Sequence, residues 1–523
     1  MVTKNFVINN RYFDSIMLMS LSNRLREKVS GIEEAAAIMG SDENKKILRE
    51  AGLLDEEGER ALPGDLIIAI KGKSQEAVES GWKVAMDLLR GEAEKIDEKK
   101  AGASPRTIKS ALKVLPDANL VLISLPGEYA ASEAMEAISR GMNVMVFSDN
   151  VPVEEEIAIK RAGEKRGLFV LGPDCGTSII NGVALGFANV VRRGVFGIVG
   201  AAGTGIQELV SLIHRKGYGI THAIGTGGRD LSEEVGGIAF INALRVLGDD
   251  SRTEVIILLS KPPSPDVARR VIDEVISIGK PAVIVFLGNE TSVEKDISGY
   301  SIQFAQNLEE AVERGISLYE KKEYRPSEFT MPENEVNQLV EREANRVGRG
   351  RFLRGLFSGG TLADEAIFIL RKKLGKVYSN TVKEDEFYLE NPEISREHTI
   401  IDMGEDYFTK AKPHPMIDFT LRKERIVKEA SSGECGVILF DVVLGFGVHV
   451  DPASELASAV EKAREIANKD GWYISFVCSI TGTDEDPQNY SVQKKKLLDA
   501  GVIVMDSNAQ AAALCGYILG VEN

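Results

Sequence analysis

Sulfur, imidazole and long apolar stretches are scarce in this sequence. Its 523 residues include only four cysteines and five histidines, and no two cysteines form a CxxC pair. This argues against a zinc site and is typical of reduced, buried thiols. No apolar run approaches the about 20 residues of a membrane helix, and no secretory signal precedes the first elements. We therefore expect a soluble, cytoplasmic protein with no membrane partner and no residues dedicated to a metal.

Basic charge is also in short supply. Lysine and arginine number 63 against 79 acidic residues, which gives a net charge of −16, and no basic stripe stands out. Such a chain is unlike proteins that follow a nucleic-acid backbone, so we expect no nucleic-acid partner. Glycine, in contrast, is abundant at 50 residues, which suits a fold with many strand-to-helix turns.

A strand–glycine turn–helix unit occurs twice. The first copy is FGIVGAAGTGIQELVSLI, Phe196–Ile213, and the second is RGLFSGGTLADEAIFIL, Arg354–Leu370. Each is a short apolar run, a turn of small residues and a helix with apolar residues at helical spacing. Backbone N–H groups at such a turn, together with the helix dipole, favour an anion. Two copies suggest one phosphate or carboxylate site built from two related halves.

The similarity extends beyond the turns and predicts about five strands with intervening helices, twice. A duplication of this length is strong evidence for the fold and weak evidence for chemistry. The paired segments are Thr253–Pro263 with Cys435–Gly447, Lys280–Thr291 with Gly471–Thr483, and Tyr300–Val312 with Gly501–Leu514.

The predicted fold class is a multi-domain α/β protein with mostly parallel sheets, whose ligands bind outside the carboxyl ends of the strands. We expect a Rossmann-like domain of the CoA-binding type and two flavodoxin-like domains packed across a pseudo-twofold axis. The predicted domains are a small α/β module at 1–95, a truncated Rossmann-like domain at 105–192, and flavodoxin-like domains at 194–320 and 350–523.

Three motifs in Asn119–Val312 resemble the α subunit of succinyl-CoA synthetase: GPDCG at Gly172–Gly176, the turn GIVGAAGTGIQE, and IGTGG at Ile224–Gly228. The stretch Gly355–Leu514 resembles the carboxy-terminal domain of the β subunit, through VILFDVVLGFGVHVDPASE. The fused order, behind a small amino-terminal module, resembles the FdrA family. Some members of that family are described as a subunit of oxamate carbamoyltransferase.

Departures from the synthetase pattern bear on the chemistry. The synthetase carries phosphate on a histidine, but the corresponding stretch here, Leu287–Asn307, contains none. Lys261, in LLSKPPSP, stands where the family has the glutamate that holds the phosphohistidine. A lysine there would stabilise an anion directly. Residues 1–118 lack the first glycine-rich loop, and the ATP-grasp half is absent, which argues against CoA thioester synthesis by this chain alone.

Two groups of residues are predicted to form the site. Those expected to act in catalysis are His414, His449, Lys261 and Arg229. The plainer alternatives stay open: a histidine bonded to a nearby carbonyl, a stiff exposed loop at KPHPMIDF, and surface cations. The residues expected to bind phosphate or substrate are Gly203, Thr204, Gly205, Gly227, Gly228, Ser358, Gly359, Gly360, Thr361, Gly445 and Gly447.

The resemblance to FdrA implies transfer of a carbamoyl or similar acyl group between phosphate and a small acid amide such as oxamate, without a phosphohistidine. One alternative is a nucleotide-dependent acyl-CoA synthetase subunit completed by an ATP-grasp partner. Another is a non-catalytic binding or scaffold subunit. Expected partners are an acyl or carbamoyl phosphate, an amide or acid substrate, and further subunits or copies of the chain. The cofactor is left open, with Mg²⁺ as one possibility.

Overall fold

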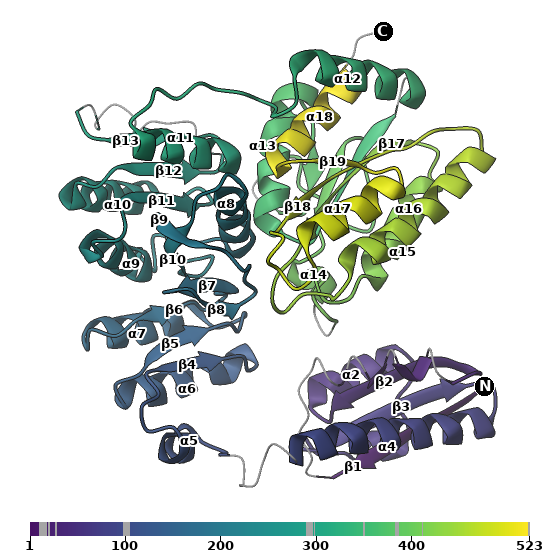
Figure 1. Cartoon of the computed structure of the whole chain (residues 1–523). Helices are drawn as coiled ribbons and strands as arrows, with labels where there is room; N and C mark the ends of the chain where they lie inside the picture. Colours follow the sequence, from purple (N-terminus) through teal and green to yellow (C-terminus); the bar gives the residue numbers. More distant parts are fainter. Residues whose placement is uncertain are drawn as a thin grey trace. The chain divides into compact units, whose positions relative to one another are not determined.

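The computed structural model describes residues 1–9, 18, 21–22, 24–26, 29–97, 105–288, 297, 299–348, 351–381, 386–409 and 412–520. The chain divides into two compact units, and Figure 1 shows the elements of each. One unit comprises Met1–Val114 with Lys410–Pro413, and the other comprises Leu115–Thr409 with His414–Asn523. None of the described helices is long and apolar enough to cross a membrane.

The first unit is built on a three-stranded antiparallel sheet. Its central strand is fully apolar over Leu66–Ile70, and these five residues are buried, because strands flank it on both sides and helices cover it. Ser41 caps the first described helix by accepting a hydrogen bond from the Asn44 N–H. The elements are β1 (Val2–Ile8), β2 (Ile32–Met39), α2 (Asp42–Glu50), α3 (Glu56–Glu59), β3 (Leu66–Gly72), α4 (Gln75–Asp97) and α5 (Ile108–Val114).

The second unit begins with a short parallel sheet in the order β4-β5-β6. It lies in the segment 105–192, for which a truncated Rossmann-like domain is predicted, and it does not extend over the last part of that segment. A hairpin of two strands, residues 177–186, pairs antiparallel with the next sheet instead. The elements are β4 (Leu120–Ile123), α6 (Gly127–Ser139), β5 (Asn143–Val146), α7 (Val153–Glu164), β6 (Val170–Leu171), β7 (Thr177–Ile180) and β8 (Val183–Gly186).

Two larger sheets carry the internal repeat, and their strand orders agree. The first is β13-β12-β11-β9-β10-β7-β8 and the second is β15-β16-β14-β17-β18-β19. Five strands of each, taken in chain order, run 2-1-3-4-5 across the sheet, the flavodoxin-like order. The bounds of the five strands in the first sheet are β9 (Arg193–Gly200), β10 (Ile220–Gly225), β11 (Val255–Ser260), β12 (Ala282–Phe286) and β13 (Ile302–Phe304). Those in the second are β14 (Phe352–Phe357), β16 (Thr399–Asp402), β17 (Cys435–Val443), β18 (Ser475–Thr481) and β19 (Ile503–Met505), with β15 (Tyr378–Ser379) as an additional edge strand.

The two repeats share one hydrophobic core. Leu209 and Ile213 of α8 belong to the same buried cluster as Leu362 and Ile367 of α13 and Leu514 of α18. In Figure 1, α8 and α13 lie between the two sheets, each packed on its own strands. The remaining helices are α8 (Gly203–Arg215), α9 (Ile238–Asp249), α10 (Pro265–Ile278), α11 (Leu308–Glu320), α12 (Glu333–Val347), α13 (Gly360–Leu374), α14 (Asp406–Thr409), α15 (Thr420–Ala430), α16 (Pro452–Lys469), α17 (Tyr490–Asp499) and α18 (Asn508–Gly520).

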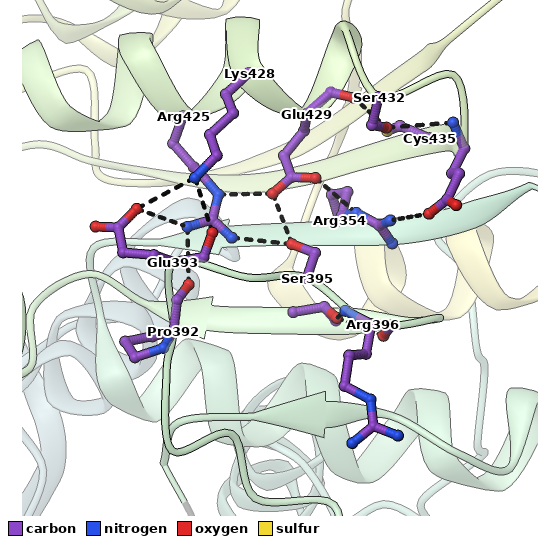
Figure 2. A network of polar contacts seen from close by, with 12 residues as sticks. Arg354, Pro392, Glu393, Ser395, Arg396, Arg425, Lys428, Glu429, Ser432 and Cys435 are labelled. Atoms are coloured by element: carbon purple, nitrogen blue, oxygen red, sulfur yellow. Dashed lines mark hydrogen bonds and ion pairs between the residues drawn. The ribbon is translucent and has the colours of Figure 1, made fainter.

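A buried ion-pair network fixes the segment that leads into β16. Glu429 on α15 accepts from Arg354 Nε at 2.8 Å and from Arg425 Nε at 2.6 Å. Ser395 Oγ also donates to Glu429 at 2.6 Å, and Arg425 donates to the Pro392 carbonyl at 2.8 Å (Figure 2). Both oxygens of the Glu429 carboxylate accept hydrogen bonds, and these bonds offset the free-energy cost of removing the charges from water. The network holds the approach to β16, whose last residue, Asp402, enters the candidate site.

Candidate active site

The starts of α8 and α13 touch each other. A methyl group on Gly359 would lie 2.8 Å from the Thr204 side chain, and one on Gly205 would lie 2.7 Å from the Thr361 side chain. Each threonine therefore packs on a glycine of the other turn, and only glycine permits this separation. The two glycine turns, which the sequence suggested as halves of one site, are brought together by the fold.

Part of the second turn is occupied by the protein itself. The buried Asp441 carboxylate accepts from the backbone N–H of Ser358 at 2.8 Å and of Gly359 at 3.0 Å. It also accepts from Ser358 Oγ at 2.9 Å and from Arg422 at 2.8 Å. These contacts commit the N–H groups of both Ser358 and Gly359 to the internal network, so neither is left for phosphate, contrary to the expectation from sequence.

The next N–H groups along each helix are open. The backbone N–H groups of residues 203–205 and of residues 360–362 have no hydrogen-bond acceptor among the described residues. The first N–H groups of a helix have no partner within the helix, and the dipole adds positive potential there. Six donors at two touching helix starts make a place for an anion.

Lys261 follows β11 and reaches across to the other repeat. Its Nζ lies 2.9 Å from Asp364 Oδ2 on α13, and 42% of its side chain is exposed. Burial lowers the pKa of Lys261, but the carboxylates of Asp364, Asp402 and Glu405 outweigh this and raise it overall. The anion beside Lys261 is thus a carboxylate of the protein, and part of the lysine side chain is reached by solvent.

Asp402, at the end of β16, was missed at the level of sequence. One of its oxygens would lie 2.5 Å from a methyl group on Gly360, and the other accepts from the Gly404 N–H at 2.8 Å. Burial, reinforced by Glu405 and Asp364, raises the pKa of Asp402 to about 7, while Lys261 opposes the rise. The only signal was the aspartate that ends TIID after the second glycine turn. A carboxyl with a near-neutral pKa suits proton transfer.

Asp174, in the GPDCG turn, faces the same cations. Crowding by protein atoms, together with Asp149, raises its pKa to about 6, and Lys261 and Arg229 pull it back. Solvent nevertheless reaches Asp174, which is exposed. A methyl group on Gly228 would lie 2.9 Å from its carboxylate. The predicted glycine pair therefore lets the backbone approach this aspartate.

Arg229 and Gly227 have defined partners within the protein. Arg229 donates to the Val151 carbonyl at 2.6 Å and pairs with Glu156 at 2.9 Å. Gly227 has a φ of 93°, and a methyl group there would lie 2.1 Å from the Pro173 carbonyl. Both residues join the loop after β10 to the small parallel domain, and the charge of Arg229 lowers the pKa of Asp174.

His414 and His449 have one ring nitrogen engaged. Nδ1 of His414 accepts from the Met416 N–H at 3.3 Å, and Nδ1 of His449 accepts from the Asp451 N–H at 3.1 Å. Burial, with Arg422, lowers the pKa of His414 to about 4, so its ring is neutral with the proton on Nε2. That Nε2 would lie 3.0 Å from a methyl group on Gly404, beside Asp402. His414 can donate a hydrogen bond at the site.

Gly445 and Gly447 serve the packing of their loop. Gly445 has a φ of 117°, and a methyl group there would lie 2.4 Å from the Ala188 carbonyl. One on Gly447 would lie 2.8 Å from the Phe187 ring, which stands 5.8 Å from the His414 ring. Gln488 bonds both backbone groups of Gly445. The loop thus packs beside His414. The N–H of Gly445 is used by Gln488, and a role of Gly447 in binding phosphate stays a prediction.

No group of three or more histidines, cysteines or acids among the described residues is placed to hold a metal ion. The four cysteines are free and buried, as expected.

Known proteins match several parts of the chain. A CoA-ligase family matches residues 356–518, a CoA-binding domain matches residues 192–288, and an AllF heavy metal-associated domain matches residues 1–105. The uncharacterized protein YahF of Escherichia coli K12 is 42% identical over 517 residues, which cover 98% of both chains. The chain belongs to the YahF family.

Similarity to ligases covers a part of this YahF-family chain. The α subunit of an ADP-forming succinate–CoA ligase from Staphylococcus epidermidis is 27% identical over 183 residues, which cover 34% of the chain and 58% of that subunit. Two solved structures also align. PH0766 of Pyrococcus horikoshii has a TM-score of 0.34 at 14% identity, with 80% of the chain and 86% of that structure covered. A dinucleotide-forming acetyl-CoA synthetase of Ca. Korarchaeum cryptofilum has a TM-score of 0.32 at 15% identity, with 78% and 84% covered. These scores are too low to carry an argument.

The heavy-metal family name implies a metal that the residues do not fit. Residues 1–105 contain neither cysteine nor histidine. Soft heavy metals prefer thiolate and imidazole ligands. The matched segment therefore offers no thiolate or imidazole to such a metal.

Proposed function

We propose that this chain carries the phosphate site of a transferase subunit that moves a carbamoyl or similar acyl group between phosphate and a small acid amide, as its resemblance to the FdrA family implies. The observation that carries the proposal is the meeting of two helix starts with six open N–H groups. The acyl phosphates of succinate and of carbamate present the same phosphoryl group, so one anion site suits either.

In this proposal the phosphoryl oxygens accept from the N–H groups of residues 203–205 and 360–362. The two helix dipoles and Lys261 offset the negative charge that phosphate carries. Lys261 remains available because solvent reaches it beside Asp364. Lys261 is already a cation paired with Asp364, so bound phosphate would become a second anion beside an existing ammonium.

The proton would pass through Asp402. A phosphate oxygen attacks the carbamoyl carbon, a C–O bond forms, and the C–N bond to the amide breaks. The attacking hydrogen phosphate loses one proton, and the departing nitrogen needs one. The Asp402 carboxyl would give its proton to the nitrogen and be restored by the proton of the phosphate, and the reverse reaction would run these transfers backwards. Its pKa of about 7 places both forms at neutral pH. The neutral His414 would donate its Nε2 hydrogen to a carbonyl oxygen of the substrate.

No covalent phosphoenzyme takes part. The stretch Leu287–Asn307 lacks histidine. At the site, the Nδ1 atoms of His414 and His449 are both engaged by backbone N–H groups. Direct transfer between phosphate and the amide needs no carrier.

The test is conversion of oxalurate and phosphate to oxamate and carbamoyl phosphate by the purified chain, alone and with co-purifying subunits. Asp402→Asn should abolish most turnover, while Asp499→Asn, an exposed aspartate at the end of α17, should not. Equal turnover of Asp402→Asn and the wild type would overturn the assignment of the proton.

The CoA-ligase and CoA-binding matches support a second candidate, an acyl-CoA ligase subunit that needs a partner with an ATP-grasp domain. The same preparation, given ATP, CoA and a small carboxylic acid, would then release ADP and phosphate. A chain that binds phosphate at the helix starts but turns over neither substrate set would be the non-catalytic subunit.

A further inference from the structure

A separate hollow lies at the amino ends of strands in the second large sheet, whereas the candidate active site lies at carboxyl ends of strands. It has a volume of about 340 Å³ and is lined by Ile474 and Ile503, which stand at the amino ends of β18 and β19, and by the end of α16. Lys261 and Asp402 stand at the carboxyl ends of their strands. The hollow is therefore distinct from the candidate active site, and its size is within the about 300–1,000 Å³ typical of small-molecule sites.

Three guanidinium groups and one carboxylate line this hollow. Arg342 and Arg346 lie one turn apart on α12, with 59% and 53% of their side chains exposed. Arg464 donates to the carbonyls of Ala500 at 2.5 Å and Gly501 at 2.7 Å. No carboxylate pairs with Arg464 among the residues that the structure describes. A net positive spot of this kind is unusual in a chain of charge −16.

Glu343 sets the geometry of these arginines. It is buried and accepts from Tyr473 Oη at 2.9 Å, Ser475 Oγ at 2.9 Å and Arg342 Nε at 2.9 Å. Burial alone would raise the pKa of Glu343, but these hydrogen bonds lower it overall, so the group is ionised. One carboxylate thus anchors Arg342 by its Nε, and no described residue accepts a hydrogen bond from its terminal nitrogens.

Arg346 is held by an aromatic face. Its guanidinium lies 3.9 Å from the centre of the Tyr473 ring, and its nearest Glu343 oxygen is 3.7 Å away. Stacking fixes the plane of the guanidinium without using its donors. Two pre-oriented arginine forks with free donors are the usual means of binding the oxygens of a phosphate group.

A second hollow of the same unit provides the contrast. It has a volume of about 530 Å³ and is lined by Arg161, Arg245 and Arg270. Five acidic side chains also line it, and Glu274 pairs with both sides of the Arg245 fork. Acids outnumber arginines there, so that hollow is not suited to an anion.

We infer that Arg342, Arg346 and Arg464 form a binding site for a phosphate group, either free phosphate or the phosphate of a nucleotide. The site is independent of the anion site at α8 and α13. Because α12 lies in the connection between the two repeats, an occupied site ties that connection to the second sheet.

The experiment is residue-resolved modification of arginine by phenylglyoxal on the full chain, read by peptide mass spectrometry. Phosphate and ADP are the probes, with adenosine as the control that lacks phosphate. Phosphate, ADP or both should slow modification of Arg342 and Arg346 and leave Arg161 and Arg270 unchanged. Arg342→Gln should raise the phosphate concentration for half-protection of Arg346 by about tenfold to a hundredfold, as loss of a charge-assisted contact implies.

Stronger protection by ADP than by phosphate would identify a nucleotide as the source, and equal protection would identify free phosphate. Protection by adenosine alone, or no protection of Arg342 and Arg346 at millimolar phosphate and ADP, would overturn the inference. Because the readout is tied to named residues, failure here is distinguishable from failure of the proposed transfer reaction.

Discussion

Lys261 and Asp364 form an ion pair of 2.9 Å across the two repeats of one chain. Lys261 ends a strand of the first repeat, and Asp364 lies in the first turns of a helix of the second. The pair brings a cation to the start of α13, beside Asp402 and the open N–H groups.

Removing the cation should weaken phosphate use. Lys261→Ala removes one charge-assisted contact and should raise the KM for phosphate or carbamoyl phosphate by about tenfold to a hundredfold. Lys261→Glu should do worse, because it adds a carboxylate beside Asp364 and Asp402. Steady-state kinetics with Lys321→Ala, an exposed lysine, as the control would check this. Full turnover by Lys261→Glu would show that the residue is ordinary surface.

Anion binding should be linked to the proton on Asp402. An anion at the start of α13 favours the neutral carboxyl, whose pKa is already about 7. The affinity for sulfate, which keeps its charge through the neutral range, should therefore fall as pH rises through about 7. Titration calorimetry across this range should show the fall in the wild type and a flatter profile in Asp402→Asn. The same slope in both proteins would contradict the role of Asp402.

The contact between the two helix starts should not tolerate extra volume. Gly205→Ala places a methyl group 2.5 Å from Leu259 and 2.7 Å from Thr361. Overpacking of this kind typically costs about 1–3 kcal/mol, so the melting temperature and the affinity for phosphate should both fall. Gly520→Ala meets nothing within 4 Å and serves as the control. Unchanged stability and affinity in Gly205→Ala would mean that the turns are further apart than described.

Stability should decline as pH rises, because of a buried acid between the repeats. Glu365 accepts from the Leu308 N–H and from Asn508, and burial raises its pKa from 4.5 to about 8. The folded state therefore holds a proton that the unfolded state releases, and the stabilisation present below about pH 4.5 is lost progressively through pH 8. Thermal melts across this range should show less slope in Glu365→Gln than in the wild type or in Glu335→Gln, an exposed control. Identical slopes would be the contrary result.

The chain should not become phosphorylated on histidine. Incubation with labelled ATP or an acyl phosphate should leave no acid-labile phosphate, because the carrier histidine is missing from Leu287–Asn307. Stoichiometric phosphohistidine at any position would restore the ligase reaction as the better account.

The repeat and the order of its elements along the chain could be predicted from sequence, because each strand, turn and helix leaves a local pattern. The hairpin at 177–186 could not, since its pairing with β10 depends on the tertiary fold. Asp402, Asp364 and Asp441 were missed for the same reason. Nothing in the local sequence distinguishes these aspartates. Their roles depend on contacts with residues of other elements, such as that of Asp364 with Lys261.

The most direct measurement is the position of bound phosphate in crystals of the full chain. The account predicts an anion where α8 and α13 meet, with its oxygens within hydrogen-bond distance of the N–H groups of residues 203–205 and 360–362 and of Lys261 Nζ. Ordered phosphate elsewhere on the protein, with none at these two helix starts, would contradict it.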